Sequence, residues 1–354
     1  MKLVMSAECN KEHILRRNSL DYICILAAIQ VMIAHTSAYI IGGGSGTGIL
    51  MWQIIAPGPA VVVFFAISGF LSTASFERSG GIKRFYLKRI LRIYPALIVA
   101  ILIPGMLYSI TGLVEINWIK QIPFYLKKLL TGRGHDIVPE GALGNGSLWT
   151  IFVQIQFYIL TPFLYKFLKN INRVYHVIVI LLFLIENLLH DHLLQIIDIP
   201  IIRRLYEDTC ITYLYMYLVG MCIFINRELL LPLLTNKLIL LSEIVIYVIW
   251  HWVVCVDLIF DWTYINPVSA ILASCIALGL GYFLGEHRVK YDISFGLFLW
   301  HLPVTDILHC VFGMEYSICL LLVVWFLSVL IALANCFLIE KPMFELSKRI
   351  VPKF

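Results

Sequence analysis

The chain has 354 residues, of which 60% are hydrophobic and only 14% are charged, and its mean hydropathy is +0.88. Soluble domains carry about 25% charged residues, so this composition excludes an ordinary water-soluble protein and predicts an all-α polytopic membrane protein. The net charge of +5 is too small to indicate a nucleic-acid partner, and the nine cysteines form no CxxC pair that would indicate a metal site.

Ten apolar runs are each long enough to cross ~30 Å of hydrocarbon at about 1.5 Å per helical residue. The runs are continuous and do not alternate with polar residues, so they favour helices and not the strands of a barrel. We therefore expect about ten transmembrane helices, near 20–41, 54–75, 91–110, 147–168, 174–190, 209–226, 238–256, 266–285, 292–311 and 317–339.

The distribution of Lys and Arg predicts the orientation of these helices. With the N-terminus inside, the inner segments hold twenty of these residues and the outer segments six. The positive-inside rule then predicts a multi-pass protein of the plasma or inner membrane with both termini cytoplasmic. We expect a cytoplasmic N-terminal segment at 1–19, a transmembrane domain at 20–340 and a cytoplasmic tail at 341–354. In the longest outer loop, NWIKQIPFYLKKLL predicts an amphipathic helix at the membrane surface.

Ionisable groups inside apolar runs are the candidates for function, because hydrocarbon penalises them. His35 in the first run, LAAIQVMIAHTSAYI, lies about 15 residues from the inner end and so ~20 Å deep. A neutral imidazole there can accept a proton from an alcohol, and the nearby Gln30 suggests a polar face. The alternative is a histidine that only hydrogen-bonds a neighbouring helix.

Arg89 and Arg92 lie one helical turn apart at the inner end of the third run and so share a helix face. Positive-inside anchoring is one interpretation, but Lys83 and Arg84 already provide basic anchors nearby. Guanidinium groups suit phosphates, so the pair favours a phosphorylated ligand that approaches from the cytoplasm. We count Lys83, Arg84 and Ser68 with the pair as candidate contacts of this ligand, although Ser68, in the preceding run beside a glycine, also suits close helix packing.

Further polar groups lie in later runs and extend this path through the membrane. His301 lies near the middle of the ninth run, and the last run ends in a glutamate that returns to the inner surface near the arginines. The set comprises Trp149, Gln154, Gln156, His301 and Glu340. Each can also act as a hydrogen-bonding contact between helices. Together they indicate anion-binding groups on the inner side and an imidazole above them.

Several motifs, in this order along the chain, resemble those of the membrane acyltransferase-3 family of polysaccharide and sugar O-acetyltransferases. They are LDYICILAAIQVMIAH, FFAISGFL, RILR, SLWTIFVQIQFYILTP, ISFGLFLWHLPV and IEKP. The resemblance implies ten core helices and transfer of an acyl group, usually acetyl from acetyl-CoA, to a sugar hydroxyl. It also implies that His35 activates the acceptor and that Arg89 and Arg92 lie near the coenzyme A phosphates.

Three positions depart from the pattern of that family. Cys24 stands where an arginine normally precedes the histidine by eleven residues, Gln154 where a glutamate is common, and Phe295 where a tyrosine is usual. The first departure puts a coenzyme A contact from the first run in question, and the second removes an acid–base partner.

The resulting hypothesis is a membrane O-acetyltransferase with His35 as general base and a carbohydrate or lipid-linked glycan as acceptor. No metal is expected. A flippase for lipid-linked sugars is the main alternative, since transporters also use intramembrane arginines and histidines. An oligosaccharide polymerase is disfavoured because the longest outer loop carries one arginine, and a purely structural protein because polar groups are dense in the spans.

Overall fold

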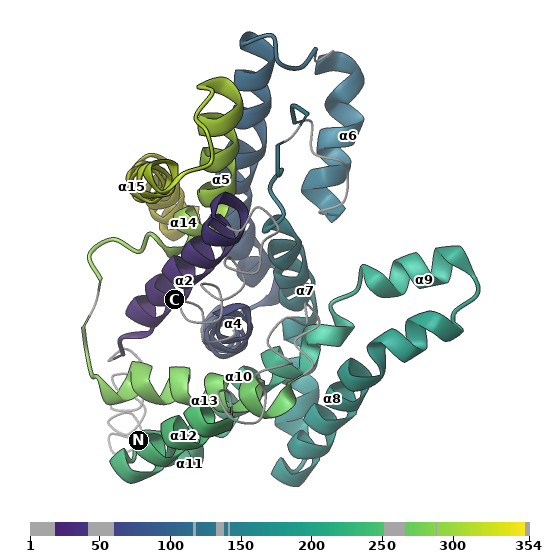
Figure 1. Cartoon of the computed structure of the whole chain (residues 1–354). Helices are drawn as coiled ribbons and strands as arrows, with labels where there is room; N and C mark the ends of the chain where they lie inside the picture. Colours follow the sequence, from purple (N-terminus) through teal and green to yellow (C-terminus); the bar gives the residue numbers. More distant parts are fainter. Residues whose placement is uncertain are drawn as a thin grey trace.

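The computed structural model describes residues 18–41, 60–115, 118–131, 138–140, 142–250, 266–287 and 289–350, and every regular element within them is a helix (Figure 1). Most of the predicted N-terminal segment, residues 1–17, lies outside the described residues. Within the described part, eight helical segments are long and apolar enough to cross a membrane. The expected all-α polytopic fold is therefore confirmed.

Most of the spans in the first two thirds of the chain are single long helices. They are α2 (Leu20–Ile40), α4 (Ala60–Glu77), α5 (Ile82–Ile110), α7 (Leu148–Asn170) and α8 (Arg173–Ile196). The next span combines three helices, α9 (Pro200–Glu207), η1 (Ile211–Tyr213) and α10 (Leu214–Ile225). Each overlaps one of the predicted apolar runs, because an apolar segment in lipid must satisfy its own backbone hydrogen bonds, although α5 and the composite span each begin nine residues before the predicted start.

The later spans are more irregular. Helices α11 (Arg227–Leu234) and α12 (Lys237–Ile249) meet at a bend of 72°, and α13 (Pro267–Phe283) has 17 residues, or ~25 Å. The last two spans join α14 (Ser294–Asp306) to η4 (Ile307–Val311), and α15 (Ile318–Asn335) through η5 (Cys336–Glu340) to α16 (Lys341–Ile350). The bent pair and α13 occupy the two remaining predicted runs, and α16 continues the last helix into the predicted tail.

Helix α4 is the centre of the bundle and packs against α2, α7, α10 and α13 (Figure 1). It crosses α10 where Gly69 faces Gly220. A Cβ atom at Gly69 would meet the carbonyl oxygen of Tyr217, and one at Gly220 would meet that of Ala66. The two backbones therefore touch, which only glycine allows. This contact explains the Ser-Gly pair as a packing feature and fixes the neighbouring Ser68 in place.

A second set of contacts joins α2, α14 and α15. Gly296 of α14 lies against Ala332 of α15, where an added Cβ would come within 2.9 Å of the Ala332 Cα atom. The indole nitrogen of Trp325 donates to the hydroxyl of Thr36, the residue after His35, over 2.9 Å. Helix α14 is thus held between α15 and α2, and its residues face the first helix.

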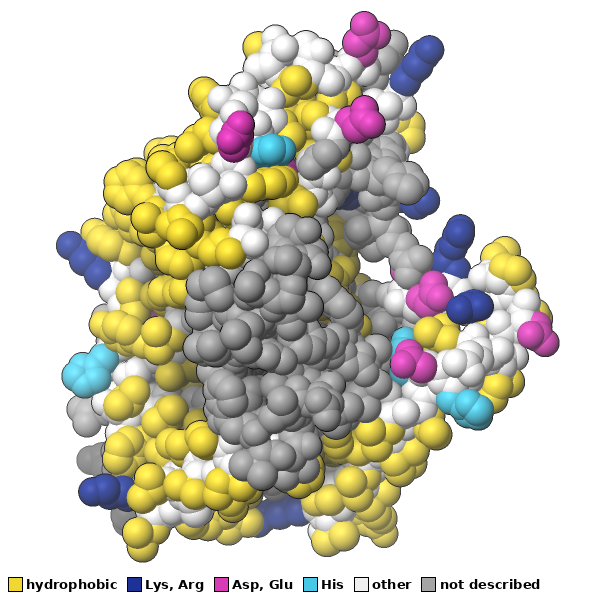
Figure 2. All heavy atoms as spheres, viewed as in Figure 1, with side chains coloured by type: hydrophobic (Ala, Val, Ile, Leu, Met, Phe, Trp, Pro, Cys, Tyr) yellow, Lys and Arg dark blue, Asp and Glu magenta, His cyan; other side chains and the backbone are white. Residues whose placement is uncertain are grey.

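The periphery is apolar and exposed, as expected of a lipid-facing surface. Apolar side chains dominate the described part of the face in Figure 2, and charged groups lie around its margins, at the upper end, along the left and lower edges and at the α8–α9 hairpin. Helix α8 buries few of its residues. The predicted amphipathic helix of the longest outer loop is present as α6 (Trp118–Thr131) at the edge of the bundle (Figure 1), and its Tyr125 and Lys128 are buried.

Candidate functional site

A cavity of about 150 Å³ opens where α2, α5 and α14 begin, and it reaches the middle of α4 and α7. We call it the arginine pocket. Its polar and charged lining residues are Asp21, Cys24, Ser68, Arg89, Arg92, Thr150, Gln154, Tyr158, Asp292 and Ser294. The structure therefore brings together four residues that the sequence marked separately, from three different helices.

Arg89 forms one wall of the arginine pocket. Its side chain is only 8% exposed. The guanidinium carbon lies 4.6 Å from the ring centre of Tyr158 and 5.3 Å from that of Phe85, and Nη2 donates to the Leu71 carbonyl over 3.5 Å. The Nε atom has no hydrogen-bond partner among the described residues. Cation–π contacts thus hold a buried charge that keeps donor capacity for a ligand.

Arg92 is more exposed than Arg89, although both lie on one face of α5. Arg92 is exposed and lines the arginine pocket. The carboxylates of Asp292 and Glu340 attract it electrostatically. Glu340 itself accepts a hydrogen bond of 2.6 Å from the amide of Asn335 and is absent from the pocket lining. The guanidinium of Arg92 is therefore the more accessible of the two to an anion.

A polar chain runs across the arginine pocket from α7 to α4. The amide of Gln154 donates to the hydroxyl of Ser68, and this hydroxyl donates to that of Tyr158 over 3.2 Å. Because Tyr158 also faces Arg89, the chain links the predicted Gln154 and Ser68 to the guanidinium. Gln154 supplies a neutral amide where a carboxylate would have competed with a ligand phosphate for the arginines.

The two predicted histidines meet across α2 and α14. Nδ1 of His35 lies 3.0 Å from Nε2 of His301, although 266 residues separate them in the chain. Their ring centres are 5.2 Å apart, and His301 is fully buried. We call these two residues the histidine pair. It lies eleven residues, or ~16 Å, along α2 from Cys24 in the arginine pocket.

Two phenylalanines separate the arginine pocket from the histidine pair. Phe64 and Phe298 line the pocket and contact each other edge to face, with ring centres 5.8 Å apart. The ring of Phe298 also contacts that of His301, at 6.2 Å. Phe298 therefore contacts both the lining of the arginine pocket and the histidine pair.

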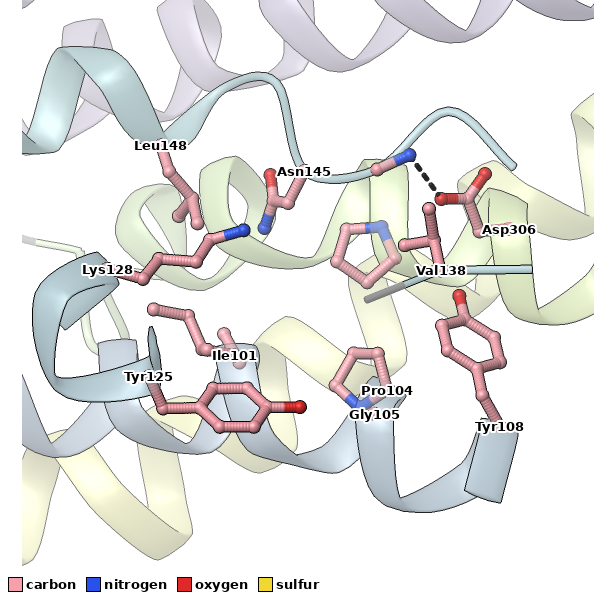
Figure 3. A pocket seen from close by; sticks show the side chains of 13 residues that line it. Ile101, Pro104, Gly105, Tyr108, Tyr125, Lys128, Val138, Asn145, Leu148 and Asp306 are labelled. Carbon is pink, nitrogen blue, oxygen red and sulfur yellow. Dashed lines mark hydrogen bonds between the residues drawn. The ribbon is translucent and has the colours of Figure 1, made fainter. Parts of the chain in front are cut away.

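A second, smaller cavity lies beyond the histidine pair, beside the end of α14 (Figure 3). Its volume is about 40 Å³, and its lining includes Tyr108, Lys128, Asn145 and Asp306. The carboxylate of Asp306 accepts hydrogen bonds of 2.8 Å from the backbone nitrogens of Leu143 and Gly144. This space suffices for one or two water molecules and not for a sugar ring.

The remaining predicted residues occupy other positions. Gln156 donates to the Asp208 carbonyl and accepts from the Cys210 nitrogen, each over 2.8 Å, and so fastens the loop after α9. Trp149 packs against Phe65 and Tyr213. Gln30 is half-buried on α2, more than a turn before His35. Lys83 and Arg84 lie in the first turn of α5, outside the pocket lining.

Sequence reasoning missed three residues that the site uses. Tyr158 lies four residues after Gln154, and this helical spacing is a signal that both share a face. Phe298 lies three residues before His301 in the same way. Asp292 gave no such signal, because it precedes α14 and reaches the pocket only through the fold.

Comparisons with known proteins identify the family of the chain. A sequence model of the acyltransferase-3 family, described as an acyltransferase domain, matches residues 17–341. The chain is similar to nodulation protein 10 of Rhizobium leguminosarum bv. viciae, with 31% identity over 170 residues, which are 44% of this chain and 46% of the relative. It is also similar to an O-acetyl transferase of Shigella phage Sf6, with 28% identity over 165 residues, 44% of this chain and 48% of the relative.

The chain thus spans about half the length of the curated relatives that it matches. No solved structure matches it. The family match extends over most of the chain, from just before α2 to the start of α16, and includes both the arginine pocket and the histidine pair. The chain therefore belongs to the acyltransferase-3 family of membrane proteins.

Proposed function

We propose that the protein is a membrane O-acetyltransferase that moves acetyl from acetyl-CoA to a hydroxyl of a surface or lipid-linked glycan. The observation that carries this proposal is the separation of two polar sites along one bundle. An arginine-lined cavity lies where α2, α5 and α14 begin, and an imidazole pair lies ~16 Å deeper. The relative from phage Sf6, named as an O-acetyl transferase, supports the reaction class.

The arginine pocket suits the anionic acyl donor. Arg92 is exposed to the cavity, and Arg89 beside it retains an unpartnered Nε atom among the described residues. Guanidinium groups bind phosphate oxygens in a fork-like geometry. The cavity of about 150 Å³ is smaller than the roughly 300–1,000 Å³ that encloses a drug-sized ligand. We infer that only part of coenzyme A enters it and that the nucleotide remains at the mouth.

His35 acts on the acceptor hydroxyl. Its imidazole accepts the hydroxyl proton as the hydroxyl oxygen attacks the thioester carbonyl carbon. The new carbon–oxygen bond replaces the carbon–sulfur bond, and the proton passes to the sulfur of the departing coenzyme A thiol. The acetyl end of the donor must reach the histidine pair past Phe64 and Phe298. This path extends from a cytoplasmic donor toward an acceptor in the outer half of the bilayer.

The test is acetyl transfer by the purified protein in lipid nanodiscs. The protein is incubated with [¹⁴C]acetyl-CoA and with lipid-linked or surface glycan from its own host, and labelled ester is measured. We expect His35→Ala to lower kcat by about 10²–10⁴-fold, the range for a lost general base, without loss of folded protein. His192→Ala, which changes an exposed histidine on α8, is the matched control and retains activity.

Two outcomes would contradict the proposal. Persistent ester formation by His35→Ala would remove His35 from the reaction. Transport of a lipid-linked sugar across the bilayer, with no labelled ester and no binding of coenzyme A, would identify a flippase instead.

A further inference from the structure

His301, the second member of the histidine pair, is fully buried, and each of its ring nitrogens has a hydrogen-bond partner. His301 lies on α14, and its Nδ1 atom is 3.0 Å from the carbonyl oxygen of Leu297, one turn earlier on the same helix. Its Nε2 atom is 3.0 Å from Nδ1 of His35. Both ring nitrogens of His301 are therefore engaged, one by a carbonyl and one by the other imidazole.

These two contacts determine which nitrogens carry protons. A carbonyl oxygen only accepts, so the proton of His301 is on Nδ1, and the neutral ring presents a bare Nε2 to His35. Nδ1 of His35 must then donate to it. A neutral imidazole carries one proton, so Nε2 of His35 is then the unprotonated nitrogen.

The charged alternative is disfavoured by the surroundings of His301. Within the described part of the chain its side chain forms hydrogen bonds or ring contacts with the Leu297 carbonyl, His35 and the ring of Phe298, none of which is a carboxylate. A buried imidazolium without a counter-charge is costly. Asp306, the nearest acidic residue along α14, is instead bonded to the Leu143 and Gly144 nitrogens.

We propose that His301 is a positioning residue that holds His35 in the tautomer whose Nε2 accepts the proton of the acceptor hydroxyl. This inference rests on the proposed role of His35 as general base. In the reaction, Nε2 of His35 gains the hydroxyl proton, and its Nδ1 proton stays in the bond to His301 Nε2. A second imidazole backed by a carbonyl thus takes the orienting place that a carboxylate holds in a Ser-His-Asp triad.

The first test compares three variants of His301 in the nanodisc acetylation assay. His301→Gln keeps an acceptor oxygen near the position of Nε2, and we expect kcat within about tenfold of the wild type. His301→Leu removes the acceptor, and we expect kcat to fall by about 10²–10³-fold, less than the 10⁴-fold of a triad with the wrong tautomer, with KM for acetyl-CoA unchanged. His309→Gln, in η4 on the same span, is the matched control.

The third variant, His301→Glu, tests the electrostatic effect of residue 301 on the protonation of His35. His301→Glu has the size of His301→Gln but adds a carboxylate, which stabilises protonated His35. Since the base works only when unprotonated, we expect the acid limb of the pH–rate profile to move to higher pH by at least half a unit relative to His301→Gln. A purely structural role of residue 301 would change the amount of folded protein and would leave this limb in place.

Ring-¹⁵N nuclear magnetic resonance of His35 in nanodiscs reads the tautomer without any turnover. We expect an N–H signal at Nδ1 and a bare-nitrogen signal at Nε2 in the wild type, and a mixture of tautomers in His301→Leu. A proton on Nε2 in the wild type, or His301→Leu with unchanged kcat and pH profile, would overturn the inference. If His35→Ala itself retains activity, His35 is not the general base and the proposed function fails. The tautomer measurement still shows whether His301 orients His35, because it does not depend on activity.

Discussion

The arginine pocket and the histidine pair are two polar sites in one apolar bundle, and they are built in opposite ways. In the pocket, Arg92 is exposed to a cavity of about 150 Å³, and several helices contribute charged or polar groups. In the pair, His301 is fully buried, and a single 3.0 Å contact joins it to His35. One site is open and charged, and the other is closed and orders its groups through fixed hydrogen bonds.

This difference indicates a division of labour between binding and chemistry. An accessible guanidinium can exchange water for a phosphate and so contributes to affinity. A buried imidazole whose proton is placed by a partner is suited to proton transfer. We therefore expect changes in the pocket to alter KM for the donor and changes in the pair to alter kcat. Of the following four predictions, ordered from the largest expected effect to the smallest, the first three test this division, and the fourth concerns a buried charge outside both sites.

The largest effect is expected for Arg92→Ala. Loss of a charge-assisted hydrogen bond costs about 1.5–3 kcal/mol, so KM for acetyl-CoA should rise about 10–100-fold while kcat stays within about threefold. Arg84→Ala, in the first turn of α5 and outside the pocket lining, is the matched control and should leave KM within about twofold. Steady-state kinetics in nanodiscs measures both. A fall in kcat at constant KM for Arg92→Ala would contradict this division between donor binding at the pocket and chemistry at the histidine pair.

A smaller effect is expected for the barrier between the sites. Phe298→Leu keeps an apolar side chain but removes the ring that contacts both Phe64 and His301. The wider passage should favour longer acyl groups, and we expect kcat/KM for butyryl-CoA relative to acetyl-CoA to rise about tenfold, the effect of roughly one methylene in a pocket. Phe295→Leu, at the same pocket but without a ring contact to His301, serves as the comparison. Equal ratios in the two variants would argue against a passage at Phe298.

Cys24 gives a direct report on occupancy of the arginine pocket. Its half-buried side chain lines the cavity with Arg92, so a small thiol reagent should reach it there. Acetyl-CoA, whose sulfur is held in the thioester and so does not consume the reagent, should slow labelling about fivefold at four times its Kd, because labelling then proceeds only in the unoccupied fraction. Peptide mass spectrometry measures the rate, and Cys319, exposed near the start of α15, is the internal control. Equal protection of both cysteines would contradict binding at the pocket.

The smallest effect concerns the other end of the bundle, outside both sites. Burial lowers the pKa of the Lys128 ammonium on α6 from 10.5 to about 8. Between about pH 8 and 10.5 the unfolded chain therefore binds a proton that the folded chain has released, so stability rises with pH across this window and is lost as pH falls toward 8.

The slope is at most about 1.4 kcal/mol per pH unit for one proton. Lys128→Met should remove it, and Lys127→Met, at an exposed neighbouring position, should not. Thermal unfolding in detergent between pH 7.5 and 9.5 provides the measurement. An identical pH dependence in the wild type and Lys128→Met would show that this lysine is not the group responsible.

Much of this arrangement was predictable from local patterns. The spacing of Arg89 and Arg92 placed both on one helix face, and the ten apolar runs predicted a bundle in which eight helical segments of the described residues are long and apolar enough to span. Gln154 and Gln156 show where such reasoning ends. They are two residues apart, so they point to different sides of α7, and only the packing of α7 decides which one meets Ser68 and which one fastens the Asp208 carbonyl.

The sequence by itself determined that the chain is a helical membrane protein and which few ionisable residues lie inside its spans, because hydrocarbon imposes long apolar runs and makes every exception visible. Only the tertiary structure decided that His35 meets His301 across 266 residues, and that Arg89 is packed under Tyr158 while Arg92 faces the cavity. The physical reason is that helix rotation and crossing are set by side-chain contacts between helices, such as the close approach of Gly69 and Gly220, and not by hydropathy along any single helix.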